Sequence, residues 1–472
     1  MRSGRRRIRG GKDVKRLANR RTYLGLVLAL LGIALVLAAV AGSARGQHAA
    51  LGGFKTPALG AHPKYAFIGD AQPGQTVFEC QTDTVGSAVD GNACYGPGQI
   101  RTAYDINPLL SQGIDGSGRT IVIIDAYGSP TIDQDLQLFD TAFGLPAPSF
   151  SIINMPGLKP FDPTDPNQVG WSAETSLDVQ WSHAIAPGAK IVLVVAKTSD
   201  DADILAATKY ALDNKLGDIL SQSYGEAEQC MDPSLLGQQH QIFDSMSAQG
   251  WTLFASAGDN GSNQPTCDGN SLFQAASTPA SDPDVTSVGG TQLHASPVVL
   301  SPPPPPFKIL DPGGQYQSES TWNEIPTFGA GGGGFSVVYP RPDFQAPIVK
   351  NSKMRALPDV AYNAAVDGGV IGFWGVPFGP GAAFRFGGTS AGSPQWSGLI
   401  AIADQLAGGR VGNINKTLYF LGKKNQSMFF HDVADGSNNI AFTATPGFDE
   451  ATGWGSPIAS SIVPAIAKPG NG

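Results

Sequence analysis

The chain is poor in charge. Only 15% of its 472 residues are Asp, Glu, Lys or Arg, whereas Gly (60) and Pro (36) are abundant and 41% of the residues are hydrophobic. This composition excludes a coiled coil and a disordered chain, and it is typical of a loop-rich globular protein. The length allows one large domain or two or three small ones.

Positive charge is scarce beyond residue 21. Ten of the 31 Lys and Arg residues lie in residues 1–21, together with only one of the 39 Asp and Glu residues. The rest of the chain therefore has 21 basic and 38 acidic residues. Nucleic-acid binding needs clustered Lys and Arg, so the composition excludes a nucleic-acid partner. Because the rest of the chain has few basic residues, it gains little net positive charge when its carboxylates are protonated in acid, and so little repulsion between like charges. Acidity that only keeps the protein soluble is an equally good interpretation.

One long uncharged apolar run, Tyr23–Gly42, follows the basic leader. Its 20 residues are enough to span a bilayer, and Ala39-Val40-Ala41 offers a signal-peptidase site. We expect residues 1–42 to be a basic leader with a signal peptide or a membrane anchor. In either case the positive-inside rule predicts an exported protein, extracellular or attached through residues 23–42 to the outer face of the cytoplasmic membrane.

Cysteine is rare, with four residues, but the count is even. In an exported chain this predicts two disulfides, most simply Cys80–Cys94 and Cys230–Cys267. No CxxC spacing indicates a zinc site. Four free thiols are the alternative, which an oxidising compartment disfavours.

From about residue 97, short apolar runs alternate with helical patterns. The runs are often β-branched and suit strands that are buried on both faces of a parallel sheet. This alternation predicts an α/β layered fold whose sites lie at the carboxyl ends of the strands. The expected strands are Thr120–Ala126, Lys190–Ala196, Asp218–Tyr224, Thr252–Gly258 and Val285–Gly290, and the expected helices are Ser172–Ala184, Asp200–Lys215 and Gln238–Gln249.

Two low-complexity segments interrupt this pattern. Pro302–Pro306, five consecutive prolines, cannot lie in a central strand and predicts a stiff surface excursion. Gly329–Gly334 predicts a flexible or closely approached stretch of backbone.

A candidate nucleophile, Ser390, follows Gly-Thr at the head of the mostly apolar segment Trp396–Ala403. A loop-to-helix junction supplies free N–H groups that can stabilise an oxyanion. Taken alone, however, the motif is better explained by Ser390 as a helix N-cap with Pro394 in the first turn.

A nucleophilic serine needs a base, and the histidines offer no convincing one. There are six, and only His183 lies in a suitable part of the chain. Glu174 and Asp178 are four residues apart, which places both carboxylates on one face of a helix. Their surroundings are apolar rather than charged, which favours a partly buried pair holding a shared proton over a solvated acidic face. Asp259, after a strand and a glycine, could be a turn residue or could project into the same site.

In this setting the chain resembles the sedolisins, or serine-carboxyl peptidases, which share the subtilisin fold but use Glu in place of His as the base. The likeness covers residues 97–460 approximately, and its weight lies in the order of the motifs. These motifs are Glu-x-x-Leu-Asp at 174–178, Ser-Tyr-Gly at 223–225, Ser-Ala-Gly-Asp at 256–259, Val-Gly-Gly-Thr at 288–291, Gly-Gly-Gly-Phe-Ser at 332–336, Tyr-Pro-Arg-Pro at 339–342 and Gly-Thr-Ser-x-x-x-Pro at 388–394.

The resemblance implies a role for each matching residue. Ser390 is the expected nucleophile, Glu174 the general base, Asp178 the group that orients Glu174, and Asp259 the oxyanion-hole donor, with Asp125 extending the network. Asp259 must then be protonated, since an ionised carboxylate only accepts hydrogen bonds. The implied activity is hydrolysis of peptide bonds in protein or peptide substrates at acidic pH.

The resemblance also implies a Ca²⁺ site in the C-terminal loops, where surface turns are the alternative. Asp432 and Asp449 would give side-chain oxygens, and Val433, Thr445 and Gly447 would give backbone oxygens, which are ligands that Ca²⁺ prefers.

We therefore expect a subtilisin-like parallel sheet flanked by helices, with a C-terminal calcium-binding loop region. Residues 97–466 would form the catalytic domain, and residues 43–96 a linker with a disulfide-stapled loop that is too short for a full prodomain. We expect a monomer. The rival hypotheses are an idle, membrane-tethered binding protein on this scaffold and a subtilisin-type enzyme that uses His183.

Overall fold

The computed structural model describes residues 63–72, 74–86, 91–439 and 441–468. The basic leader and the apolar run Tyr23–Gly42 lie outside these residues, so the prediction of a signal peptide or anchor stays a prediction. Among the described residues, no helix is both long and apolar enough to cross a membrane.

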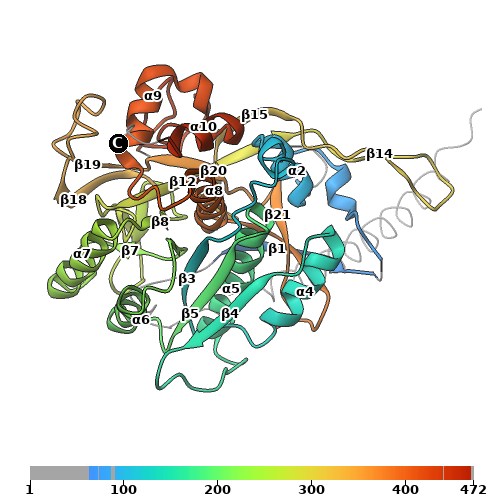
Figure 1. Ribbon diagram of the computed structural model, residues 1–472, viewed down its shortest axis with the longest axis horizontal. Helices are drawn as coiled ribbons and strands as arrows, with labels where there is room; N and C mark the ends of the chain where they lie inside the picture. The colour runs from blue at the N-terminus through green and yellow to red at the C-terminus, as the bar shows by residue number, and fades with distance from the viewer. Residues whose placement is uncertain (1–62, 73, 87–90, 440, 469–472) are drawn as a thin grey trace, which may run out of the picture. The chain divides into compact units, whose positions relative to one another are not determined.

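The centre of the described chain is an eight-stranded sheet, in which seven strands run parallel and β15 lies antiparallel beside β12. The strand order is β15-β12-β8-β6-β3-β5-β4, with β20 also paired to β12 (Figure 1). The α/β architecture expected from the sequence is therefore confirmed. The strands are β3 (Thr120–Ala126), β4 (Ser149–Asn154), β5 (Lys190–Ala196), β6 (Ile219–Gln222), β8 (Thr252–Ser256), β12 (Val285–Ala295), β15 (Tyr316–Thr321) and β20 (Val360–Asn363).

Helices cover both faces of this sheet because side chains alternate along each buried strand. Ile121 and Ile123 of β3 pack into one hydrophobic cluster with α5 (Pro166–Ile185) and α8 (Gly392–Ala407). Val122 and Ile124 pack into the other cluster, with α6 (Asp201–Asp213) and α7 (Pro233–Ala248). The remaining helices are α2 (Pro97–Ala103), α3 (Asn107–Leu110), α4 (Ile132–Phe143), α9 (Asn415–Phe429) and α10 (Ala459–Ile466), with 3-10 turns η1 (Glu79–Thr82) and η2 (Thr389–Ala391).

The helix α5, which carries two of the candidate catalytic acids, begins six residues before the predicted start at Ser172. Asp165 caps it by accepting a hydrogen bond from the Asn167 N–H, and Pro166 occupies the first helical position. A proline there lacks only an N–H that would have no partner inside the helix.

A second, four-stranded sheet, in the order β1-β22-β21-β2, joins the segment before residue 97 to the body. The strand β1 (Lys64–Asp70) pairs antiparallel with β22 (Ala382–Gly387), and β2 (Cys94–Tyr95) pairs with β21 (Gly369–Phe373). The segment 43–96, expected to be a linker with a stapled loop, thus also contributes strands. The domain boundary at residue 97 stays a prediction.

Both predicted disulfides are present, Cys80–Cys94 and Cys230–Cys267. The first lies at the entry to β2, and the second joins the loop after β7 to the loop between β9 and β10. The remaining short strands are β7 (Glu226–Ala227), β9 (Asn263–Pro265), β10 (Leu272–Gln274), β11 (Ser277–Thr278), β16 (Asn323–Glu324), β17 (Gly329–Ala330), β18 (Gly334–Pro340), β19 (Met354–Leu357), β23 (Phe430–His431) and β24 (Ser456–Pro457).

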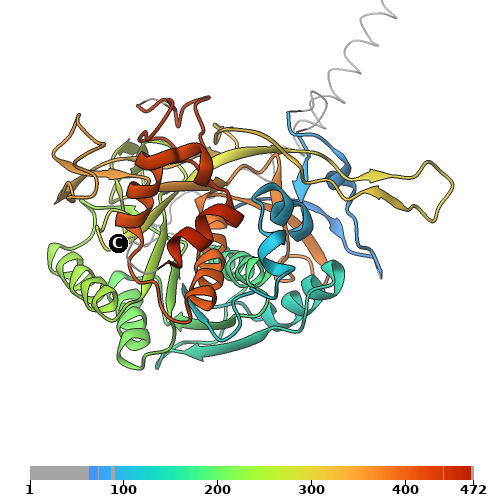
Figure 2. The same ribbon diagram turned by 45° about the horizontal axis from the view of Figure 1, so that its top comes forward.

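The proline run forms the tip of a hairpin between β13 (Val299–Leu300) and β14 (Ile309–Asp311). In Figure 2 this hairpin extends away from the sheets, and its prolines are exposed, as the sequence predicted. The glycine run is closely approached instead. A side chain at Gly332 would collide with the carbonyl of Ala257, and one at Gly333 with that of Glu450.

Candidate active site

Ser390 lies in η2, between the end of β22 and the start of α8. The turn into η2 passes through Gly388 at φ 94°, a conformation that favours glycine. The Ser390 side chain is nearly buried, at 4% exposure, and its Oγ donates to the backbone oxygen of Ser223 over 3.4 Å. It makes no capping hydrogen bond at the start of α8, so the N-cap interpretation of Ser390 is wrong.

Three acids gather behind Ser390, and all three are fully buried. Glu174 and Asp178 lie one turn apart on α5, which packs against η2, and Asp125 lies near the carboxyl end of β3. Ser223, just after β6, donates its hydroxyl to Asp178 Oδ1 over 2.8 Å. Within the described part of the chain, both oxygens of Glu174 and of Asp125 lack a hydrogen-bond partner that meets geometric criteria.

Burial and mutual repulsion favour the protonated forms of these acids. Burial first, and then the charges of Asp178 and Asp125, raise the pKa of Glu174 well above its usual value, while the nearby Ser390 hydroxyl partly opposes this. Burial and the charge of Asp125 likewise raise the pKa of Asp178. Burial raises the pKa of Asp125 to about 7. The cluster therefore retains protons in mild acid.

Asp259 follows β8 and faces the turn that carries Ser390. Its Oδ1 accepts two hydrogen bonds of 2.8 Å, from the N–H and the hydroxyl of Thr389. Its Oδ2 lies so close to Gly388 that a Cβ there would approach it to 2.7 Å. Burial raises the pKa of Asp259, although the positive charge of Lys64 and the Thr389 bonds oppose the rise.

A cavity of about 260 Å³ opens beside Ser390 and Asp259. Ser223, Tyr224 and Gly225 form part of its wall, and Glu226 and the Cys230–Cys267 disulfide lie farther along it. The Ser390 hydroxyl, the buried carboxyl groups and an adjacent cavity thus meet in one place, which is the arrangement expected of a hydrolytic site.

His183 takes no part in this arrangement. Its Nε2 lies 2.9 Å from the carbonyl of Pro146 and 3.3 Å from Asp140 Oδ1, and the ring is fully buried. On the same helix, it lies nine residues beyond Glu174 and five beyond Asp178, which is about 13.5 Å and about 7.5 Å along the helix axis. A subtilisin-type site that uses His183 therefore has no support in the structure.

Known proteins with this arrangement are found by sequence and by structure, although no protein-family model matches the chain. Kumamolisin of Bacillus sp. is 32% identical over 79% of this chain and 63% of its own length. Sedolisin of Pseudomonas sp. is 29% identical over 77% of this chain and 59% of its own length. The solved structure of Pseudomonas sedolisin, described as a serine-carboxyl proteinase in complex with pseudo-iodotyrostatin, superposes with a TM-score of 0.65 at 27% identity. The superposed region covers 78% of this chain and 97% of the solved chain. The chain belongs to the sedolisin family.

This sedolisin-family chain spans about 60% of the length of the curated relatives that it matches. The matching solved structure fits the subtilisin-like α/β fold that the resemblance implied, so that expectation is confirmed. The ordered motifs were thus the right signal, because no single one of them identified the family.

In the C-terminal loops of the sedolisin-family chain, the five residues expected at a Ca²⁺ site lie close together. Asp432 accepts hydrogen bonds from the Gly447 N–H, and Asp449 Oδ2 accepts from the Thr445 N–H over 2.8 Å. The Thr452 hydroxyl reaches both Asp449 Oδ1 and the carbonyl of Val433, over 3.3 and 3.4 Å. Two carboxylates and several carbonyls in one loop region form a hard-oxygen donor set that fits Ca²⁺.

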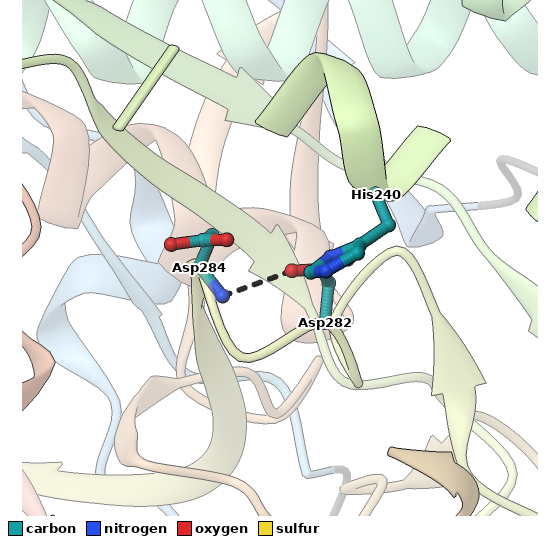
Figure 3. A group of neighbouring side chains, drawn as sticks. All are labelled: His240, Asp282 and Asp284. Atoms are coloured by element: carbon teal, nitrogen blue, oxygen red, sulfur yellow. Dashed lines mark hydrogen bonds and ion pairs between the residues drawn. The ribbon is translucent and has the colours of Figure 1, made fainter. Parts of the chain in front are cut away.

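A separate cluster joins α7 to the loop before β12. His240, Asp282 and Asp284 bring potential metal ligands within 4.8 Å of one another (Figure 3). However, His240 Nδ1 lies 2.8 Å from Asp282 Oδ2, and Asp282 Oδ1 accepts from the Asp284 N–H. The bond to Asp282 raises the pKa of His240. We interpret this cluster as an ion pair that fastens α7.

Sequence reasoning missed three residues of the site. Lys64 comes from β1, in the segment expected to be a linker, and its place opposite Gly387 follows only from the pairing of β1 with β22. Ser223 was noted as part of a motif but not as the partner of Asp178. Glu226 had one available signal, its position directly after Ser-Tyr-Gly.

Proposed function

We propose that the chain is an exported serine-carboxyl endopeptidase that hydrolyses peptide bonds of proteins at acidic pH. The observation that carries the proposal is the meeting of Ser390 and Asp259 at the mouth of one cavity, with Glu174 behind Ser390 and no histidine among these groups. The family supports the same reaction class. The two disulfides support an oxidising, extracytoplasmic location.

In this mechanism, ionised Glu174 takes the proton of the Ser390 hydroxyl while Oγ attacks the substrate carbonyl. Asp178, held by Ser223, orients Glu174 from one helical turn away. The acyl-enzyme then forms as Glu174 returns the proton to the leaving amine. In the second half of the reaction, Glu174 takes a proton from a water molecule, which attacks the acyl-enzyme. Ser390 regains its proton from Glu174 as the acid product leaves.

Asp259 supplies the oxyanion donor. Because Oδ1 already accepts two hydrogen bonds from Thr389, its proton belongs on Oδ2, where it can be donated to the developing oxyanion. One such donor is worth roughly 10²- to 10³-fold in rate.

The site has four carboxyl groups, and only one of their singly ionised forms is active. In this form the negative charge lies on Glu174, and Asp125, Asp178 and Asp259 keep their protons. This form is populated at pH values between the first and the second ionisation of the four carboxyl groups. Because the groups interact, these two pKa values describe the set of four and not a single residue. Activity is therefore lost at low pH when Glu174 is protonated, and at higher pH when a second proton leaves.

Calcium would be held by Asp432, Asp449 and the backbone oxygens of Val433, Thr445 and Gly447. When bound, it supplies structural support to the C-terminal loops by offsetting the two carboxylate charges. Surface turns without a metal remain the alternative, and removal of Ca²⁺ separates the two.

The deciding experiment is cleavage of denatured protein at pH 4 by Ser390→Ala. Loss of a nucleophile typically costs on the order of 10⁶-fold in kcat. Ser397→Ala, in the helix α8 that follows Ser390, is the matched control, because the Ser397 hydroxyl only donates to the Ser393 carbonyl within α8. Cleavage retained by Ser390→Ala, with Ser397→Ala as active as the native chain, would refute the proposal.

A further inference from the structure

The cavity beside Ser390 is lined in part by an acid, Glu226. Along its wall, Ser223, Tyr224 and Gly225 lead directly from the partner of Asp178 to Glu226 in β7. β7 is held by its pairing with β11, where Glu226 lies opposite Thr278. The cavity volume of about 260 Å³ equals about nine water molecules at about 30 Å³ each, enough for a long side chain.

Glu226 is 6% exposed, and a second acid, Asp201 at the start of α6, lies against it at 9% exposure. The two carboxyl groups lie close enough to share a hydrogen bond once one of them holds a proton. Glu226 Oε1 and Asp201 Oδ1 have no other hydrogen-bond partner among the described residues. A buried carboxylate without a donor is costly, so this end of the cavity favours a ligand that donates.

No cation of the described chain neutralises the pair. No ion pair joins Glu226 or Asp201 to a Lys, Arg or His in the residues that the structure describes. Asp200 and Asp232 add to the negative potential at Asp201. Nearby Lys197 is bound to Asp203 over 3.0 Å. Lys64 also lines the cavity, but its charge acts on Asp259, at the nucleophile's end.

The position of the pair fixes which substrate residue it meets. A substrate carbonyl attacked by Ser390 and held by Asp259 sits at the mouth of the cavity. The side chain of that same residue starts one bond away from the carbonyl carbon, at Cα, and is therefore the group that enters.

We propose that Glu226, supported by Asp201, binds the cationic side chain of the residue that donates the attacked carbonyl, so that the chain cleaves after Arg or Lys. This inference rests on the proposed peptidase function and goes beyond it by naming the preferred substrate. A guanidinium or ammonium in the cavity would donate to Glu226, the acid of the pair that lines it, and its charge would replace the proton that the pair holds.

The preference should strengthen as the pH rises within the working range. Burial and the charge of Asp201 raise the pKa of Glu226 to about 8, so the free pair is largely protonated in acid. A bound cation favours the ionised form and must therefore displace a proton. The proton is displaced more easily as the pH rises, so binding of a cationic side chain becomes stronger. Binding of an apolar side chain displaces no proton and should not change with pH in this way.

The test uses two peptides that differ only at the residue before the scissile bond, Arg in one and Leu in the other. We expect the native chain to give a kcat/KM for Arg at least about tenfold above that for Leu, with a ratio that rises from pH 3.5 to pH 5. Glu226→Gln should reduce the ratio by about 10- to 100-fold, the range of a charged hydrogen bond. Asp213→Asn, an exposed acid on the helix of Asp201, should leave the ratio unchanged.

The ratio separates this inference from the peptidase function. A native chain that cleaves both peptides equally, or Leu faster, overturns the subsite and leaves the peptidase intact. A native chain that cleaves neither peptide overturns the peptidase function itself. If Glu226→Gln fails to fold, Asp201→Asn serves instead, and competitive inhibition of the native chain by benzamidine supplies a second measurement. An inhibition constant for benzamidine no lower than that for neutral benzamide would refute the cation subsite.

Discussion

Two groups of buried carboxylates in this protein lie in opposite electrostatic environments. At the active site, Asp125, Glu174 and Asp178 are fully buried beside one another. Elsewhere, Asp359 is equally buried but accepts two hydrogen bonds from Arg355, of 2.8 and 2.6 Å, on a side chain that is also fully buried. Asp359 further accepts from the Ser287 N–H and the Tyr419 hydroxyl.

The comparison teaches what buried acids do when a counter-charge is or is not supplied. Arg355 supplies a counter-charge to Asp359, and their ion pair is a structural link between β12 and the chain before β20. Asp125, Glu174 and Asp178 have no ion-pair partner in the described part of the chain and instead hold protons, which is a cost to folding and, in the proposed mechanism, a requirement for catalysis. Removing a charge should therefore have opposite consequences at the two places.

The largest effect is expected for Glu174→Gln. Loss of the general base should lower kcat by 10³-fold or more, while the free energy of unfolding stays the same or rises, since one of three crowded acids has gone. Measurement combines peptide hydrolysis at pH 4 with urea unfolding.

Glu319→Gln is the matched control for Glu174→Gln, because Glu319 is also buried but accepts from the hydroxyls of Tyr104 and Thr291. It should lose about 1–3 kcal/mol of stability and keep its activity per folded molecule. Unchanged activity in Glu174→Gln would remove Glu174 from the mechanism.

Arg355→Met should produce the reverse result. Leaving Asp359 buried without its partner should lower the free energy of unfolding by about 3–5 kcal/mol, with kcat per folded molecule unchanged. Lys209→Met breaks a pair with the same four-residue spacing whose side chains are 60% and 54% exposed. It should cost no more than about 0.5 kcal/mol. Equal losses in the two variants would contradict the distinction drawn here.

Removal of Ca²⁺ tests whether Asp432 and Asp449 form a third kind of environment. There a metal ion would supply the counter-charge, as Arg355 does for Asp359. Chelation with EGTA should lower Tm, since a ligand present at 100 times its Kd stabilises by about 2.7 kcal/mol. Asp432→Asn should have a lower Tm that no longer responds to EGTA. A native Tm that chelation leaves unchanged would speak against the site.

Among substitutions of the candidate catalytic residues, the smallest effect on maximal rate is expected for Asp259→Asn. The raised pKa of Asp259 means that its catalytic proton is present below that pKa and lost as the pH rises through it. An amide donates at every pH, so the variant should keep much of its activity and extend it toward neutral pH. Rate profiles from pH 2 to 8 measure this, with Asp213→Asn as control. An unmoved alkaline limit would count against Asp259 as the oxyanion donor.

The buried sheet was predicted well because its strands depend on local sequence. Thr120–Ala126 and Lys190–Ala196 match β3 and β5 residue for residue, since continuous β-branched runs favour strands covered on both faces. The edge strand β4 was missed, because Ser149–Asn154 is only partly buried and carries no such run.

The residues of the candidate site that belong to short sequence motifs could be predicted. Glu174, Asp178, Asp259 and Ser390 were each named from the sequence, and the structure brings them together. What could not be predicted is contact between distant segments. The pairing of Lys64 with Gly387 and the approach of Asp201 to Glu226 depend on tertiary packing, which no short pattern encodes.

The link between β1 and β22 has a consequence for processing by other proteases. Lys64 is held beside the nucleophile by the β1–β22 ladder, and Cys80 and Cys94 tie the chain that follows β1 to β2. A nick between Cys80 and Cys94 would therefore leave both fragments covalently joined, with β1 still in place. A cut between residues 70 and 80, by contrast, leaves no disulfide across the break, so β1 is then held only by non-covalent contacts, among them its six paired positions with β22.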